Sequence, residues 1–372
     1  MTKFWVGGYG ADMDGDAAGI GLIEGDEGRE PTTLAYRGTT VAVASPSWLA
    51  SHPTLDVVYA ALEGSGTVQA FVRDGESSLA PVGGAVDAGS GVCHLAVAPN
   101  GEYLVASCYG DGRVVRIGLD AGGRLGATKI ADAATDPYGA DAVEGALGAD
   151  TSVDLAALLA TASPGTARTS HAHAAAFLPD GRIATTDLGF DTVRIWRTST
   201  DPSSGAAGLV ADHDVVLPHG TGPRHMVVHP SGHLHVVTEY SCEVFTLAAG
   251  PSGHWALASA TTVSPVAQTG GDYPSELSRS RDGETLYAGV RGSNTIAALR
   301  VRGDGSKVEP FALAESGVDW PRHHLVHDGA LLVAGQRSDQ ISVLDLDERS
   351  GAPRGIRHRT AAPSPTSILF AH

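Results

Sequence analysis

Short apolar runs alternate with glycine-containing turns along the whole chain. The most complete unit lies between Gly220 and Tyr240, where a polar pair precedes an apolar run, a Pro-Ser-Gly turn and a second apolar run. Turns of this composition between two apolar runs are typical of β-hairpins. We therefore expect a hairpin whose first strand begins with Arg224 and His225 and whose second strand ends at Glu239.

Weaker copies of this hairpin recur elsewhere in the sequence. When the copies are aligned on the turn glycine, their polar residues fall into one column, which comprises Cys93-His94, His173, Arg224-His225, Ser275-Glu276 and Arg322-His323. Most copies open about 50 residues apart, a period typical of repeats that bury their apolar faces against neighbouring repeats. Pro46 opens a further copy before this series, and Pro365 opens another after it.

The two ends of the chain each contain part of one repeat. The copy at Pro365 lacks its continuation, whereas residues 3–9 form an apolar run with no hairpin before it. We therefore expect an all-β fold, a seven-bladed β-propeller of four-stranded antiparallel blades, closed by pairing of the N- and C-terminal strands in one blade. Residues 3–9 are expected as an outer strand of that blade, and a strand at Gly19 to Ile23 as part of the next blade.

Residues 1–372 are expected to form a single propeller domain, because the repeats extend over the whole chain. The interval between two successive copies of the hairpin is longer here than elsewhere, which predicts an insertion at about residues 120–170. A short Ala- and Leu-rich helix is expected within it, near residues 150–160. Loops of this length are usually functional or mobile. A lid over one propeller face and an irregular excursion both remain open.

Composition and charge narrow the class of protein. The 48 Gly and 20 Pro residues fit many short strands joined by tight turns. A net charge of −17 argues against nucleic acid or an anionic membrane as a partner, because both attract basic surfaces. The chain shows no targeting segment and no long apolar stretch, so a cytoplasmic protein is expected. Its three cysteines lack CxxC spacing and are expected to be buried free thiols.

The polar column predicts a site on the propeller axis. The innermost strand of every blade lines the central channel, so residues at the starts of these strands converge on one face. Glu239 and Arg291 end the following strands and are expected at the same rim. The resulting site would contain His94, His173, Arg224, Glu276 and Arg322, whereas His225 and His323 are expected to pack between blades.

These residue types suit the opening of an anionic lactone. Arginine binds carboxylate or phosphate through a planar fork and stabilises an oxyanion. Histidine or glutamate can act as general base or general acid. Because His171 and His173 share one face of a strand, they are candidates for a metal-binding pair. No further Asp or His spacing supports a metal, so no metal and no cofactor are expected.

The sequence resembles the seven-bladed propeller lactonase family, which includes propeller-type 6-phosphogluconolactonases and fungal 3-carboxymuconate lactonising enzymes. The resemblance rests on a series of segments: His171-Ala172-His173, Phe177 to Arg182, Asp187-Leu188-Gly189, Gly222 to His225, Pro274-Ser275-Glu276, Arg291-Gly292 and Pro321-Arg322-His323. It implies a cofactor-free site of one His, two Arg and one Glu. By motif these fall on His173, Arg224, Glu239 and Arg291.

We therefore expect hydrolysis of an anionic sugar lactone such as 6-phosphogluconolactone by a monomer or homodimer. Arg322, Glu276, His94 and His171 are expected to contact the substrate, and either His173 or Glu239 to act as the base. A carboxymuconate cycloisomerase would use the same groups to move a proton during lactone formation. A binding scaffold without enzymatic activity is the alternative of another class.

Overall fold

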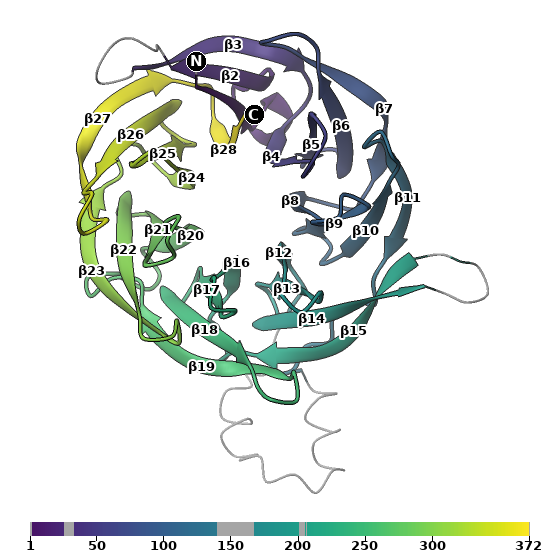
Figure 1. The fold of residues 1–372 in the computed structure, drawn as a ribbon, viewed down its shortest axis with the longest axis vertical. Coiled ribbons are helices and arrows are strands. Elements are labelled where there is room, and N and C mark those ends of the chain that lie inside the picture. The colour runs from purple at the N-terminus through teal and green to yellow at the C-terminus, as the bar shows by residue number, and fades with distance from the viewer. Residues whose placement is uncertain (1, 26–32, 140–166, 201–204, 206, 372) are drawn as a thin grey trace, which may run out of the picture.

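The computed structural model describes residues 2–25, 33–139, 167–200, 205 and 207–371. These residues form seven four-stranded antiparallel sheets, arranged as blades around a common axis (Figure 1). The predicted seven-bladed propeller is therefore confirmed. The helix expected near residues 150–160, and with it the question of a lid, lies outside the described residues.

The blades are numbered here in chain order, with strands given from the innermost to the outermost. Blade 1 consists of β4 (Pro46–Ser51), β5 (Val57–Leu62), β6 (Thr67–Arg73) and β7 (Leu79–Asp87), and blade 2 of β8 (Val92–Val97), β9 (Tyr103–Cys108), β10 (Val114–Leu119) and β11 (Leu125–Ile130). Blade 3 consists of β12 (Ala172–Phe177), β13 (Ile183–Asp187), β14 (Thr192–Thr200) and β15 (Ala207–Val216), and blade 4 of β16 (Pro223–Val228), β17 (Leu234–Thr238), β18 (Glu243–Ala249) and β19 (Trp255–Thr262). Blade 5 consists of β20 (Tyr273–Arg279), β21 (Thr285–Arg291), β22 (Thr295–Arg302) and β23 (Lys307–Glu315), and blade 6 of β24 (Pro321–His327), β25 (Ala330–Gly335), β26 (Gln340–Leu346) and β27 (Pro353–Ala361). Blade 7 consists of β28 (Pro365–Phe370), β1 (Lys3–Gly8), β2 (Gly19–Gly25) and β3 (Leu34–Ala42), with the short 3-10 helix η1 (Ala11–Met13) between β1 and β2.

Blade 7 closes the ring with strands from both ends of the chain, which lie close together in Figure 1. Phe370 of β28 pairs with Phe4 of β1, as the sequence predicts. Two details of the prediction were wrong: β1 is the second strand of its blade, and β2 belongs to blade 7 instead of the next blade. A short connection keeps β2 beside β1, because sequential strands joined by few residues usually pair.

Burial differs sharply between inner and outermost strands. Every residue of β5, β9, β21 and β25 is buried, because these strands pack against neighbouring blades on both faces. In β11, by contrast, all residues after Leu125 are exposed. This strand lies inside the range of about 120–170 expected to be an insertion, and it belongs to blade 2. Its few apolar side chains gave no strand signal.

A residue with left-handed backbone geometry precedes the third strand, directly or by one residue, in blades 1 to 6. These residues are Gly66, Gly112, Asp191, Cys242, Asn294 and Asp339, with φ between 50° and 70°. In blades 3 and 4 the carbonyl of this residue accepts the backbone N–H that follows the outermost strand, as in Leu217 N to Asp191 O at 2.9 Å. Gly, Asn and Asp tolerate this geometry best, so the turn composition reflects a backbone requirement.

We expect Asp191→Ala to lower the free energy of unfolding by about 3 kcal/mol. The buried Asp191 carboxylate accepts hydrogen bonds from the backbone N–H groups of Gly220 at 2.9 Å and Gly222 at 2.8 Å, and pairs with Arg168 at 2.9 Å. Alanine would lose these acceptors and strain the left-handed backbone. Urea unfolding measures the loss, and Asp191→Asn, which retains one acceptor, should lose less. An alanine variant as stable as the wild type would contradict this role.

Candidate active site

Each innermost strand carries a register shift near its start. In blade 4, Pro223 pairs with Thr238 and His225 with Val237, so Arg224 has no residue opposite it. β-bulges of this kind redirect a side chain and are common beside active sites. The residues displaced from pairing at the shifts include Ser47, Cys93, His173, Arg224, Ser275, Arg322 and Thr366. The polar column of the sequence thus follows a recurring backbone feature.

Arg224, Glu239 and Arg291 meet at one point, and we call them the Glu239 cluster. Oε2 of Glu239 lies 2.9 Å from Nε of Arg224 and 2.6 Å from Nη2 of Arg291. The backbone N–H of Glu239 donates to the Gly222 carbonyl at 2.8 Å, which fixes the end of β17 beside the start of β16. The Glu239 side chain is 17% exposed, so the cluster is reachable from solvent.

The charges of the Glu239 cluster favour an anionic ligand. Burial acts to raise the pKa of Glu239, but the charges of Arg291 and Arg224 outweigh it and lower that pKa. Burial lowers the pKa of Arg291 to about 10, which leaves this guanidinium charged at neutral pH. Two cations therefore share one carboxylate oxygen. A guanidinium pair of this kind can bind a carboxylate, a phosphate or a developing oxyanion.

Arg322 belongs to the same rim but has different partners. Its Nη1 donates to Oε1 of Gln336 at 3.2 Å, and its guanidinium stacks over the Tyr9 ring at 4.9 Å. The Tyr9 hydroxyl lies 3.1 Å from both carboxylate oxygens of Glu63. Sequence reasoning missed Tyr9, Glu63 and Gln336 as parts of the site. The position of Glu63 directly after β5, like that of Glu239 after β17, was an available signal.

His173 lies at the bulge of blade 3 and is 8% exposed. Its ring faces Tyr109 edge-on with the centroids 6.1 Å apart. Burial, together with the charges of Arg224 and Arg322, holds the pKa of His173 well below its usual range. Within the described part of the chain, its buried Nδ1 has no hydrogen-bond partner. A neutral imidazole with a free nitrogen can accept a proton.

His171 and His94 do not join the Glu239 cluster. His171 precedes β12, stacks on Tyr109 at 4.4 Å, and contacts the Tyr109 carbonyl through Nδ1 at 2.6 Å and the Thr169 hydroxyl through Nε2 at 2.9 Å. Both of its ring nitrogens are therefore engaged. His94 is buried one residue further along its strand than the bulge, where Nδ1 accepts the Ala175 N–H at 3.3 Å. The substrate-binding roles expected for both residues stay predictions.

A second tier of side chains, one residue beyond the bulges, meets across the axis. The Trp48 ring lies 4.3 Å from His94, 5.6 Å from His225 and 5.3 Å from His323, measured between centroids. These residues come from blades 1, 2, 4 and 6, so His225 and His323 contact side chains across the axis in addition to packing between blades, as was expected of them. The three Nδ1 atoms do each lie within 3.4 Å of a backbone N–H of the following blade.

Glu276 belongs to this second tier and is also buried. Its Oε1 lies 3.5 Å from Nδ1 of His225, while Oε2 has no hydrogen-bond partner among the described residues. Burial raises the pKa of Glu276 well above its usual range, against the opposing charge of Arg224. This environment favours the protonated carboxyl, which can donate one hydrogen bond and accept others.

Among the residues that the structure describes, no group of three or more His, Cys, Asp or Glu side chains is arranged to hold a metal ion. Over the same residues, no helix has the length and apolar character needed to cross a membrane. Cys93, Cys108 and Cys242 are free and buried, as expected.

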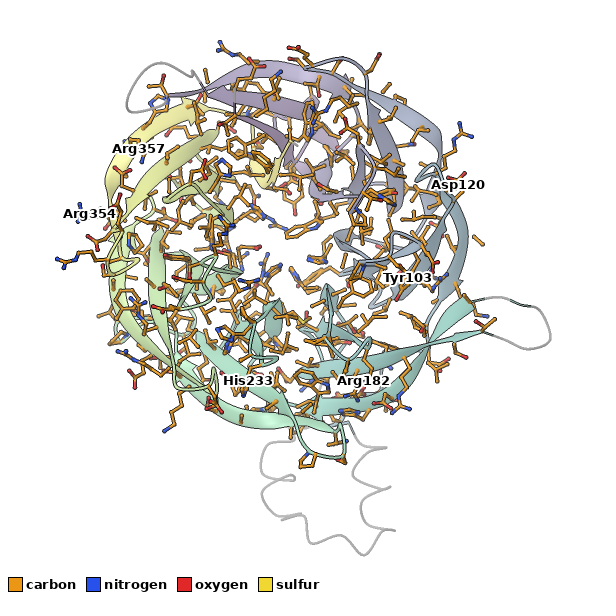
Figure 2. The ribbon with its side chains drawn as sticks, in the orientation of Figure 1. Tyr103, Asp120, Arg182, His233, Arg354 and Arg357 are labelled. Atoms are coloured by element: carbon orange, nitrogen blue, oxygen red, sulfur yellow. The ribbon has the colours of Figure 1, made fainter. Side chains whose placement is uncertain are left out.

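A second polar region, a cleft of about 1220 Å³, lies between blades 5 and 6 away from the axis. Arg354 and Arg357 line it and lie at the outer edge of the ring (Figure 2). They already pair with Asp347 and Asp345 respectively. None of the site residues predicted from the sequence lines this cleft, so the axial rim remains the candidate site.

Comparison with known proteins gives a match over residues 3–370 to the family described as Lactonase, 7-bladed beta-propeller. A 6-phosphogluconolactonase from Bacillus subtilis is 22% identical over 380 residues, which cover 100% of this chain and 99% of that protein. Periplasmic gluconolactonase from Pseudomonas aeruginosa superimposes with a TM-score of 0.82 at 21% identity, over 100% of this chain and 99% of the other. A putative 6-phosphogluconolactonase from Bacteroides fragilis gives 0.81 at 19% identity, over 100% and 98%. At these identities the structural likeness establishes the fold.

Proposed function

Because the chain belongs to the seven-bladed β-propeller lactonase family, we propose that it hydrolyses an anionic sugar lactone of the 6-phosphogluconolactone kind at the Glu239 cluster. The observation that carries the proposal is the convergence of Arg224 and Arg291 on one carboxylate oxygen beside a backbone bulge. A site built around paired guanidinium groups suits a reaction that develops negative charge on a carbonyl oxygen.

In the proposed reaction, a water oxygen attacks the lactone carbonyl carbon and the carbonyl oxygen becomes an oxyanion. Arg224 and Arg291 stabilise this charge, while Glu239 holds both guanidinium groups in place. The bond between the carbonyl carbon and the ring oxygen then breaks, and the ring oxygen takes up a proton. The product is the open hydroxy acid. The proton lost by water and the proton gained by the ring oxygen balance, so the step consumes no co-reactant.

His173 is the better candidate for the base that removes the proton from water. Burial and the charges of Arg224 and Arg322 favour its neutral imidazole, whereas Oε2 of Glu239 is occupied by two cations. We expect His173→Gln to lower kcat by about a hundredfold, the lower end of what a general base contributes, because an imidazole with a depressed pKa is a weak base. Steady-state kinetics with thermal melting as a folding control measures the effect. Unchanged kcat would assign the role to another group.

The proposal is tested by measuring ring opening of 6-phosphogluconolactone, corrected for spontaneous hydrolysis, in parallel with unphosphorylated gluconolactone and 3-carboxymuconate. Turnover of the lactones above the spontaneous rate supports the proposed function. Conversion of carboxymuconate alone would favour the cycloisomerase, which would use the same cluster to move a proton. Activity on none of the three would reject both reactions and favour a binding scaffold.

A further inference from the structure

Trp320 occupies an unusual backbone conformation at the rim of the axial site. Its φ is 61°, in the left-handed region that bulky residues rarely adopt. The Trp320 N–H donates to Oδ1 of Asn294 at 2.9 Å, and Nδ2 of Asn294 donates to Asp319 at 2.9 Å. Strained residues that the surroundings hold in place cluster at functional sites. The residues that contact the Trp320 ring therefore indicate which groups this backbone conformation holds in place.

Two arginines contact the Trp320 ring, and one of them belongs to the Glu239 cluster. The guanidinium carbon of Arg291 lies 5.3 Å from the ring centroid, and that of Arg337 lies 3.6 Å from it. Arg337 directly follows Gln336, which binds Arg322. The Trp320 ring thus joins the Glu239 cluster to a further cation at the same rim.

Arg337 differs from the other rim arginines because its guanidinium has no hydrogen-bond or ion-pair partner among the described residues and contacts only the Trp320 ring. Arg224 and Arg291 share Glu239, and Arg322 donates to Gln336. Arg337 is exposed, and no carboxylate of the described residues lies within ion-pair distance of it. A guanidinium stacked on an indole keeps its edge N–H groups available for a planar anion.

We propose that Arg337, held on Trp320, binds a second anionic group of the substrate, a phosphate monoester or a carboxylate, at the end away from the reacting carbonyl. This inference rests on the proposed function. Since both guanidinium carbons lie within the stated distances of one ring centroid, Arg291 and Arg337 are separated by no more than the sum of those distances. The two guanidinium groups are therefore close enough for one small ligand to contact both.

The test compares Arg337→Ala with the wild type on 6-phosphogluconolactone, on gluconolactone and on a lactone carrying a distal carboxylate. We expect kcat/KM for the phosphorylated or carboxylated lactone to fall about ten- to a hundredfold, mainly through KM, because a charge-assisted hydrogen bond is lost. Activity on gluconolactone should stay within about twofold. Which anionic lactone loses activity identifies the group bound. Arg349→Ala, at another exposed arginine in the turn between β26 and β27, is the matched control.

An equal effect of Arg337→Ala on charged and uncharged lactones, or no effect on either, would overturn the inference while leaving the proposed function intact. Failure of the wild type to open any lactone would reject the proposed function instead. In that case calorimetry still decides the role of Arg337. Tighter binding of 6-phosphogluconate than of gluconate, lost in Arg337→Ala, would support the anion subsite, and equal binding of the two acids would overturn it.

Discussion

Arg224→Ala is expected to lower kcat/KM for 6-phosphogluconolactone about 10²- to 10³-fold, the range observed when one oxyanion-stabilising donor is removed. Arg224 lies 2.9 Å from Glu239, and burial with the nearby charge of Arg322 lowers its pKa, countered by Glu239. Removing this guanidinium leaves Arg291 as the remaining partner of Glu239. The transition state would then lose one of its two hydrogen-bond donors. The bound substrate would lose less stabilisation, because its carbonyl oxygen carries less negative charge.

Arg224→Lys provides the matched control for that measurement. Lysine keeps the positive charge but lacks the planar fork that reaches Glu239 and a ligand at once. We expect its activity to lie between those of the wild type and the alanine variant. Thermal melting should be recorded for both variants, because Arg224 is buried and its loss leaves a carboxylate with one partner fewer. A loss below about threefold in a folded alanine variant would exclude the proposed role of Arg224.

Acidification from pH 7 to pH 5 is expected to reduce the free energy of unfolding steeply. Burial lowers the pKa of His94 and His235 to about 3 and that of His324 to about 4, and it holds the pKa of His225 and His323 well below the usual range. His173 behaves in the same way. Each of these histidines becomes protonated in the unfolded chain near pH 6.5 while the folded protein keeps it neutral.

The sign of the effect depends on whether the folded or the unfolded state binds more protons. Below about pH 6.5 the unfolded chain binds more protons, so each such histidine removes about 1.4 kcal/mol of stability per pH unit until its folded pKa is reached. Glu276 acts in the opposite sense, because its raised folded pKa adds stability at low pH. One opposing group does not offset several histidines. Two pH units could therefore remove an amount comparable with the whole stability of a domain, about 5–15 kcal/mol.

Urea unfolding at several pH values measures this loss. His225→Gln should reduce the slope of stability against pH by about 1.4 kcal/mol per unit, because one buried titrating group disappears. His219→Gln, at an exposed position, is the matched control. Stability that stays constant between pH 7 and pH 5 would mean that these buried histidines bind protons in the folded protein at the same pH as in the unfolded chain.

The ring and part of its site follow from the sequence because both depend on the repeat. A bulge recurs at the same place in every innermost strand, so polar residues aligned by the turn glycines converge in space. Arg224, Glu239 and Arg291 were therefore predicted together and lie together. Their roles stay predictions until variants are measured.

Other features left no periodic signal. Tyr9 reaches Glu63 across 54 positions of sequence, from a blade that the repeat does not contain in full. Trp48 contacts histidines of three other blades across the axis. Aligning the repeats predicts how far along the axis a residue lies, but it does not predict which side chains extend far enough to meet. The strand β11 is nearly all exposed and lacks the apolar alternation that marks a strand. Trp320 depends on a positive φ that no sequence pattern reveals.

The pairing of Phe4 with Phe370 also governs how fast the ring can form and come apart. The entropy cost of closing a loop grows only slowly with loop length. Pairing the two ends of the chain therefore costs little more entropy than closing a much shorter loop. Rates respond differently: contacts between residues so distant in sequence slow folding. We therefore expect closure of blade 7 to be a late event on the folding pathway. We expect unfolding to begin with the release of β28 from β1. The rate of that release would then set the lifetime of the native ring.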